Sequence, residues 1–364
     1  MNNVLGIINV TKENDELKEL TPYRCHASLP YGGRYRLIDF LLSNMVHSKI
    51  RNVAIFTPPH YRTLMDHLGS GKDWDLEYKR DGLFIFPKTN ATNSNQGDLS
   101  VLYQHLDYLE KSSQEYVLLS FGSLIINMDF QQVMKQHIDS GAEVTVLYKQ
   151  KDITDSSYTN ITMDDFYNIT NFKASESTMG SLDIFILKKE LLIQAIKRYS
   201  PHYSNLIEVL KQCDLMQSVK GYHCEGPVQK LSSIQEYYKS SMDLLNQHAL
   251  KELVTFPNEI YTKLSDDPPT KYASTSSVTN SIIANGCVIE GEVENSILFN
   301  NVHVKKGATI KNSIVMSNSE IGEHSYLDKV IVDEEVFVLP EENKIGSSYN
   351  PKVVGSNNTV GAID

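Results

Sequence analysis

The chain has 364 residues, with 34 Lys and Arg against 45 Asp and Glu, and a formal net charge of −11 at pH 7. This length is sufficient for two domains with a large buried core. The acidic balance disfavours a nucleic-acid partner, because phosphates require a basic face. No apolar run approaches the roughly 18 residues of a membrane span, so no membrane association is expected.

Cysteine usage and the first residues bear on location. The four cysteines are scattered and form no Cys-x-x-Cys pair. We interpret them as free thiols in a reducing cytoplasm rather than as a zinc site. The chain opens on a short apolar strand without a basic segment and a long apolar run, so no signal peptide is expected. The cysteines are Cys25, Cys213, Cys224 and Cys287.

The first two-thirds of the chain alternate predicted strands with predicted helices. The strands are expected at Val4–Val10, Asn52–Thr57, Tyr116–Ser120 and Glu143–Lys149, and the helices at Asp39–Ser48, Tyr61–Leu68, Leu99–Leu109 and Gln131–Ser140. Such alternation predicts an α/β domain with a mainly parallel sheet covered on both faces. Ligands of such sheets bind at the carboxyl ends of the strands, which makes the loops after Val10 and Ser120 the candidate binding loops.

The composition and the spacing of apolar residues change after the α/β region. Segment 256–277 contains Ser265-Asp266-Asp267-Pro268-Pro269 and has the composition of a linker. From residue 278 short aliphatic pairs such as Ile297-Leu298 and Ile314-Val315 recur about every five or six residues, with Gly and Asn between them. That period predicts a left-handed β-helix, with a β-sandwich of short strands as the alternative. His303 and His324 are interpreted as surface residues, the alternative being the base of an acyltransferase.

One motif connects these domains to a known family. Residues 30–44 read Pro-Tyr-Gly-Gly-Arg-Tyr-Arg-Leu-Ile-Asp-Phe-Leu-Leu-Ser-Asn. With the domain order, they resemble the glucose-1-phosphate adenylyltransferases, which make ADP-glucose from ATP and glucose 1-phosphate. The resemblance implies a Rossmann-like nucleotidyltransferase domain with a GT-A-like mixed sheet over 1–255, a linker over 256–277 and a left-handed β-helix with a polar tail over 278–364. It implies that the remnants of a substrate pocket are Gly6, Gln96, Gly97, Asp98, Gly122 and Gly180.

The positions that carry chemistry in that family differ in this chain. The family's Gly-Gly-x-Gly-Thr-Arg-Leu loop, which holds the nucleotide phosphates, corresponds to Val10–Leu17, which has no glycine. A unit charge at ~4 Å is worth about 4 kcal/mol at an effective dielectric of 20, so an acid in place of the loop arginine repels a phosphate strongly. The aligned positions are Glu16 for the loop arginine, His26 for a lysine, Ser123 and Lys230 for two metal-binding aspartates, and Ser175 for the sugar-phosphate lysine.

These replacements favour a subunit without catalysis of its own. The resemblance implies a regulatory subunit that forms a heterotetramer with a catalytic glucose-1-phosphate adenylyltransferase subunit, the type found in many Gram-positive bacteria. No metal or cofactor is expected in this chain, and Mg²⁺ would be used by the partner. The alternatives are an active enzyme in which Asp129, Lys12 or Lys173 compensates, a sugar-nucleotide or sugar-phosphate sensor, and a homo-oligomer.

Three arginines surround the motif, namely Arg24, Arg34 and Arg36. They are expected either to pair with helix carboxylates such as Asp39 or to form a site for an anionic sugar-phosphate effector, as the arginines matching Arg24 and Arg36 do in the family. Asp39 itself is interpreted as the N-cap of the helix that follows it.

Overall fold

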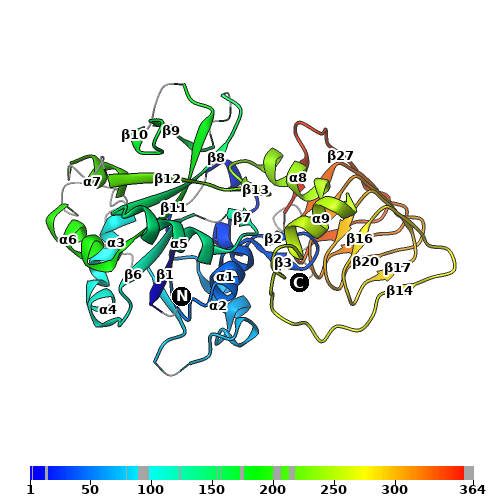
Figure 1. The fold of residues 1–364 in the computed structure, drawn as a ribbon. Coiled ribbons are helices and arrows are strands. Elements are labelled where there is room, and N and C mark those ends of the chain that lie inside the picture. Colours follow the sequence, from blue (N-terminus) through cyan, green and yellow to red (C-terminus); the bar gives the residue numbers. More distant parts are fainter. Residues whose placement is uncertain are drawn as a thin grey trace.

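The computed structural model describes residues 1, 3–12, 15–78, 80–88, 98–122, 124–153, 155, 157–172, 176–199, 206–212 and 218–355. It has an α/β domain and a β-helix that lie side by side (Figure 1). The predicted fold class is therefore confirmed. Gln96, Gly97, Ser123, Lys173, Ser175 and Cys213 lie outside the described residues.

The α/β domain is built on one nine-stranded mixed sheet. Strand order runs β10-β9-β11-β6-β1-β4-β5, and β8 pairs with β11 and with β12. β6, β1, β4 and β5 are parallel, whereas β11 runs antiparallel to both β6 and β8. The strands are β1 (Val4–Asn9), β4 (Asn52–Thr57), β5 (Leu83–Pro87), β6 (Tyr116–Phe121), β8 (Val144–Gln150), β9 (Thr159–Met163), β10 (Ile169–Phe172), β11 (Met179–Lys188) and β12 (Val219–His223).

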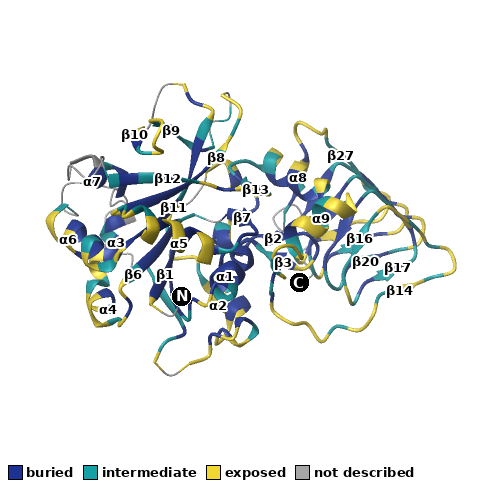
Figure 2. Cartoon of the chain, viewed as in Figure 1, coloured by how far each residue is buried: buried dark blue, intermediate teal, exposed yellow. Residues whose placement is uncertain are grey.

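Helices cover both faces of this sheet, as strand alternation requires. Ile8 on β1 faces the cluster formed with α1, whereas Leu5 and Ile7 face the cluster formed with α3 and α6. Figure 2 shows the buried residues along the strands and the exposed ones on the outer helix surfaces. The helices are α1 (Leu37–His47), α2 (Arg62–Leu68), α3 (Asp98–Gln104), α4 (Leu106–Lys111), α5 (Phe130–Ser140), α6 (Lys189–Tyr199), α7 (Leu206–Gln212), α8 (Ile234–Asp243) and α9 (Gln247–Val254).

Two helix predictions need correction. The helix expected over Leu99–Leu109 is two helices, because His105 leaves the helical region between α3 and α4 with φ −114° and ψ 28°. Asp39 is not the N-cap of α1. It lies at the third helical position, where its carboxylate accepts the backbone N–H of the true N-cap, Arg36, at 2.9 Å. The other Asp39 oxygen contacts His67 Nε2 at 2.6 Å.

The C-terminal domain is a left-handed β-helix with three five-stranded parallel sheets. The all-parallel pairing excludes the β-sandwich. β14 lies inside the segment predicted as a linker. It was not predicted because a two-residue strand between prolines and polar residues carries little sequence signal. The strands are β14 (Lys271–Tyr272), β15 (Ser277–Thr279), β16 (Ile282–Ile283), β17 (Val288–Ile289), β18 (Glu292–Glu294), β19 (Ile297–Leu298), β20 (His303–Val304), β21 (Thr309–Lys311), β22 (Ile314–Val315), β23 (Glu320–Ile321), β24 (Tyr326–Asp328), β25 (Val330–Val332), β26 (Phe337–Val338), β27 (Asn343–Ile345) and β28 (Lys352–Val354).

The motif at residues 30–44 builds the seam between the domains. It contains the hairpin β2 (Pro30–Tyr31) and β3 (Tyr35–Arg36), which packs with α8 against one face of the β-helix. A Cβ at Gly33, whose φ is +87°, would lie 2.9 Å from Ile282 Cγ2, so only glycine permits this approach. Tyr237 of α8 donates its hydroxyl to the Pro30 carbonyl at 2.6 Å. The motif thus fixes the position of the two domains.

The remaining global predictions can be compared with the described residues. No helix among them combines the length and hydrophobicity needed to cross a bilayer. Cys25, Cys224 and Cys287 are free, as predicted, and they are buried. His303 and His324 lie on turns or strands of the β-helix surface, with His303 Nδ1 3.9 Å from a Glu320 carboxylate oxygen.

Candidate functional site

The loop after β1 stands where the resemblance places a phosphate-binding loop, and its described part exposes two acidic side chains. Asn9 Oδ1 at the end of β1 accepts hydrogen bonds from the Thr11 amide at 3.1 Å and the Thr11 hydroxyl at 2.7 Å. The 3₁₀ turn Asp15–Leu17 follows, with Leu17 buried and Asp15 and Glu16 exposed. Asp15 forms an ion pair with Lys18 at 2.7 Å. The described part of this loop therefore exposes the Asp15 and Glu16 carboxylates together with Lys12.

His26 lies near Lys230 and is neutral at pH 7. Burial, reinforced by the nearby Lys230 ammonium, lowers its pKa to about 4. Its Nε2 is buried and has no hydrogen-bond partner among the described residues. An uncharged imidazole cannot balance the negative charge of a phosphate, so His26 does not replace a lysine electrostatically.

Lys230 is a cation of this region, and a carboxylate of the same chain neutralises it. It ends β13 (Val228–Lys230), which pairs with β7 (Leu124–Ile126) just after the candidate loop at residue 122. Lys230 Nζ lies 2.7 Å from Asp183 Oδ2, and the two side chains are 25% and 15% exposed. The Lys230 amide also donates to the Tyr158 hydroxyl at 3.0 Å. Lys230 is therefore held in place both by its backbone amide and by its ammonium group.

Asp183 reaches Lys230 because β11 is irregular at this point. The register of β11 against β8 shifts between Ser181 and Phe185, and Asp183 has a φ of +55°, which is uncommon for a residue with a side chain. The Asp183 amide donates a hydrogen bond to the Ser181 hydroxyl at 3.1 Å. A conformation of this kind persists only where its surroundings enforce it, and here it directs a carboxylate at Lys230.

The residues of this region do not fit a bound Mg²⁺. Magnesium requires several oxygen ligands with net negative charge, and the Lys230 ammonium lies against the Asp183 carboxylate. Across the described ranges, no three His, Cys, Asp or Glu side chains gather as a metal site. Asp129, considered as a compensating ligand, instead caps α5 by accepting the Gln131 amide at 2.8 Å. Lys12, considered as a compensating cation, is exposed on the loop after β1.

The described glycines among the predicted pocket remnants have different surroundings. Gly122 has φ +85° and open space where a Cβ would lie. Gly6 and Gly180 are packing positions: a Cβ would lie 2.8 Å from Met45 Sδ and 2.6 Å from Tyr158 Cβ, respectively. The backbone of Asp98 begins α3. Their predicted ligand contacts stay predictions.

Comparison with known proteins places these features in a family. A family described as "Nucleotidyl transferase" matches residues 14–224, and one described as "GlmU-like, C-terminal hexapeptide" matches residues 268–352. "Glycogen biosynthesis protein GlgD" of Bacillus subtilis (strain 168) is 37% identical over 356 residues, covering 97% of this chain and 96% of the relative. "Glucose-1-phosphate adenylyltransferase" of Fervidobacterium nodosum is 30% identical over 382 residues, covering 100% of this chain and 92% of the relative. The chain belongs to the glucose-1-phosphate adenylyltransferase family.

A further relative has the same name as the first. "Glycogen biosynthesis protein GlgD" of Geobacillus stearothermophilus is 38% identical over 313 residues, which cover 85% of this chain and 83% of the relative. Family membership confirms the resemblance carried by residues 30–44. It leaves untested the roles of the individual site positions.

Two of the arginines in the predicted effector site form ion pairs with the β-helix. Arg24 Nη2 lies 2.5 Å from Asp333 Oδ1, and Arg24 Nη1 lies 3.1 Å from Glu334 Oε2. Arg36 Nη2 lies 2.9 Å from the other Glu334 oxygen. The carboxylates therefore come from the β-helix and not from Asp39. We call these four residues the seam cluster.

The third arginine is separate from the seam cluster. Arg34 is exposed, and its guanidinium lies 5.4 Å from the centre of the Tyr35 ring. Effector binding by these arginines stays a prediction for this member of the glucose-1-phosphate adenylyltransferase family. Any anion that binds Arg24 and Arg36 must compete with Asp333 and Glu334.

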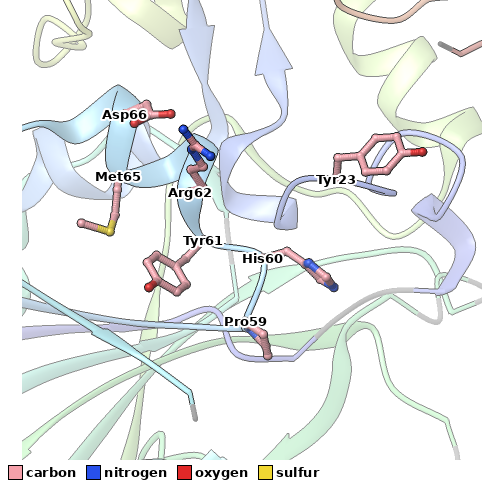
Figure 3. Close-up of a pocket in the computed structure, with 7 residues that line it drawn as sticks. All are labelled: Tyr23, Pro59, His60, Tyr61, Arg62, Met65 and Asp66. Carbon is pink, nitrogen blue, oxygen red and sulfur yellow. The ribbon is translucent and has the colours of Figure 1, made fainter. Parts of the chain in front are cut away.

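A pocket of about 490 Å³ opens next to the carboxyl end of β4. Tyr23, from the loop that precedes β2, lies on the opposite side of it from Tyr61 and Met65 (Figure 3). Arg62 and His60 add nitrogen donors and Asp66 adds one acid. The pocket lies at the edge of the sheet where parallel α/β sheets bind ligands. Its lining residues are Tyr23, Pro59, His60, Tyr61, Arg62, Met65 and Asp66.

Sequence reasoning missed Asp183 and Tyr158. The available signal for Asp183 was that it is the one acid in the otherwise apolar run Leu182–Leu187. Nothing in the local sequence indicated that it faces Lys230, which lies 47 residues away.

Proposed function

We propose that this chain is a regulatory, non-catalytic subunit of glucose-1-phosphate adenylyltransferase in glycogen biosynthesis. The observation that carries the proposal is the Lys230–Asp183 ion pair at 2.7 Å. By resemblance, Lys230 stands where the enzymes have a metal-binding aspartate. A fixed ammonium there repels Mg²⁺ and neutralises the nearby carboxylate, which opposes metal-assisted adenylyl transfer.

The other charges of the region act in the same direction. His26 is neutral at pH 7 and stands where the family has a lysine. Asp15 and Glu16 are exposed where the family binds phosphate. No cofactor or metal of its own is needed for the proposed role, and Mg²⁺ would serve the catalytic partner.

In this role the chain acts by assembly. The "Glycogen biosynthesis protein GlgD" relatives, which match most of the chain, support a place in glycogen synthesis. We propose a heterotetramer with a catalytic subunit that has the intact glycine-rich loop, located in the cytoplasm. Coupling of roughly 1–3 kcal/mol across the subunit interface would change the partner's affinity for substrate or effector about 5- to 150-fold.

The proposal is tested first with the purified chain alone. With ATP, glucose 1-phosphate and Mg²⁺ we expect no pyrophosphate release above background. Turnover of about 1–10 s⁻¹, ordinary for an enzyme, would instead establish the alternative of an active adenylyltransferase.

The second test adds the catalytic subunit of the same organism. We expect a stable mixed oligomer and a changed kcat or effector response of the partner. Wild-type chain that neither binds the partner nor alters its kinetics would refute the regulatory role.

The pocket beside β4 favours a second candidate, a sugar-nucleotide or sugar-phosphate sensor. Tyr23 and Tyr61 could stack on a base, and Arg62 could contact a phosphate. Calorimetric titration with ADP-glucose and glucose 1-phosphate distinguishes the two functions. Binding that is unaffected by the catalytic subunit would support the sensor.

A further inference from the structure

The hairpin of β9 and β10 ends in a turn that presents two aromatic side chains to solvent. Phe166 is 76% exposed and Tyr167 is 60% exposed. Neither ring stacks on another ring within the described part of the chain. The hairpin lies at the top of the α/β domain in Figure 1, away from the β-helix, and Figure 2 shows exposed residues there. We call residues 164–168 the aromatic turn.

The aromatic turn has a fixed backbone. One Asp164 carboxylate oxygen accepts the amides of Phe166 and Asn168, each at 2.9 Å, and the other accepts the Asn168 side-chain amide at 2.8 Å. The Tyr167 amide donates to the Asp164 carbonyl at 3.1 Å, and the Tyr167 carbonyl accepts from the Gly221 amide at 2.9 Å. These main-chain groups of the turn have their partners within the chain, whereas the Phe166 and Tyr167 side chains are largely exposed.

The turn is also tied closely to the sheet below it. Gly221 lies on β12, where a Cβ would come within 2.4 Å of Met163 Sδ, at the end of β9. Asn168 forms an isolated bridge with Lys220. The turn therefore cannot fold back to bury its rings without breaking these contacts.

Tyr167 occupies an unfavourable conformation. Its φ of +62° lies in the left-handed region, which Asn and Gly adopt readily and which an aromatic residue rarely does. Because Tyr167 is 60% exposed, burial within the chain compensates for this conformation only in part. Strain of this kind, with a bulky apolar ring in water, indicates a use for the ring outside the chain.

We propose that the aromatic turn is a docking contact for the catalytic subunit, with Phe166 and Tyr167 entering an apolar pocket that has a basic rim. The inference rests on the proposed function. Rigid aromatic side chains are the residues that carry most binding energy at protein interfaces, because little conformational entropy is lost when they bind.

The charges around the turn select the kind of partner. Asp164 and Asp165 are exposed beside the rings, with Lys220 behind the turn, and the whole chain has a net charge of −11. A second copy of the chain would bring like charge to the contact, whereas a different chain with Lys or Arg around its pocket would complement it. The partner is therefore a different protein chain.

The test uses the double variant Phe166→Ser/Tyr167→Asn, with Tyr103→Gln as the matched control. Tyr103 is 51% exposed on α3 and makes no part of the aromatic turn. Binding to the purified catalytic subunit is measured by surface plasmon resonance, and oligomeric state by sedimentation velocity. We expect the double variant to bind at least about 30-fold more weakly, as for a lost hot spot, and the control to bind like wild type.

A stability readout separates docking from a structural role. Because Asn tolerates the left-handed conformation, Tyr167→Asn alone is expected to melt at the same or a higher temperature than wild type while binding the partner more weakly. Asp165→Asn is expected to reduce the salt dependence of association.

The outcomes distinguish this inference from the proposed function. If wild type binds the catalytic subunit and the double variant binds within threefold of it, the docking site is wrong and the regulatory role stands. If wild type binds no catalytic subunit, the proposed function fails as well. If the double variant instead dissociates an oligomer of this chain alone, the partner is a second copy and the inference is overturned.

Discussion

The seam cluster allows a quantitative prediction for Arg24→Met. Arg24 and Asp333 have side chains only 8% and 4% exposed, so removing the guanidinium leaves a buried carboxylate without its main partner. Breaking a buried ion pair in this way costs about 3–5 kcal/mol. Arg24 also contacts Glu334, but Glu334 keeps Arg36 as a partner at 2.9 Å. Losing the contact with Glu334 therefore adds little to the cost. We expect a loss of about 3–4 kcal/mol in unfolding free energy at pH 7.

The expected cost depends on pH because Asp333 can take up a proton. Burial already raises the pKa of Asp333, against the lowering effect of Arg24. Without Arg24 this pKa rises further, so the variant is protonated at a higher pH than wild type. The difference in stability between wild type and Arg24→Met is therefore expected to shrink as the pH falls toward 5.

Urea unfolding monitored by two probes provides the measurement. Trp74, the one tryptophan of the chain, is buried in the α/β domain and reports on that domain by fluorescence, while far-ultraviolet circular dichroism also reports on the β-helix. Because the cluster joins the domains, Arg24→Met is expected to separate the two unfolding curves. In a cycle with Asp333→Leu, the double variant should be less destabilised than the sum of the single variants by at least about 1 kcal/mol.

Arg51→Met is the matched control. Arg51 also pairs with an aspartate, Asp75, but these side chains are 41% and 69% exposed. Exposed pairs contribute about 0–1 kcal/mol. A cost for Arg24→Met as small as that for Arg51→Met would refute the reasoning, because burial would then not distinguish the two pairs.

Two further predictions concern His26 and the β-helix core. The folded-state pKa of His26 is about 4, below the usual 6.5, so its neutral form stabilises the fold fully above pH 6.5 and this contribution is lost as the pH falls toward 4. His26→Gln should remove up to roughly 3 kcal/mol of that loss, seen as a flatter plot of unfolding free energy against pH; an unchanged slope would contradict it. Leu327 is fully buried in the core of the β-helix. Leu327→Ala should cost about 2–5 kcal/mol of unfolding free energy in thermal or urea unfolding, whereas a cost under 1 kcal/mol would mean that the core collapses around the cavity.

The local sequence determined the two domains and most of their elements. The aliphatic pairs at Ile297-Leu298 and Ile314-Val315 predicted the β-helix because each coil must place apolar side chains inside at a short, regular interval. The strand at Val4–Val10 was recognisable because a strand buried on both faces is continuously apolar. The helix break at His105 and the short strand β14 were not, because neither changes the apolar pattern around it.

The sequence also predicted which site positions differ from the family, since a residue type can be compared at an aligned position without knowing its neighbours. What surrounds each position was decided by the tertiary structure. Lys230 meets Asp183 across 47 residues, and Arg24 meets Asp333 across 309. Periodicity describes the spacing of residues within one segment, whereas an ion pair depends on where two distant segments cross and on the water excluded there. For that reason the sequence alone predicted the loss of a metal ligand and the presence of arginines near the motif, and only the packed domains decided which charges oppose one another.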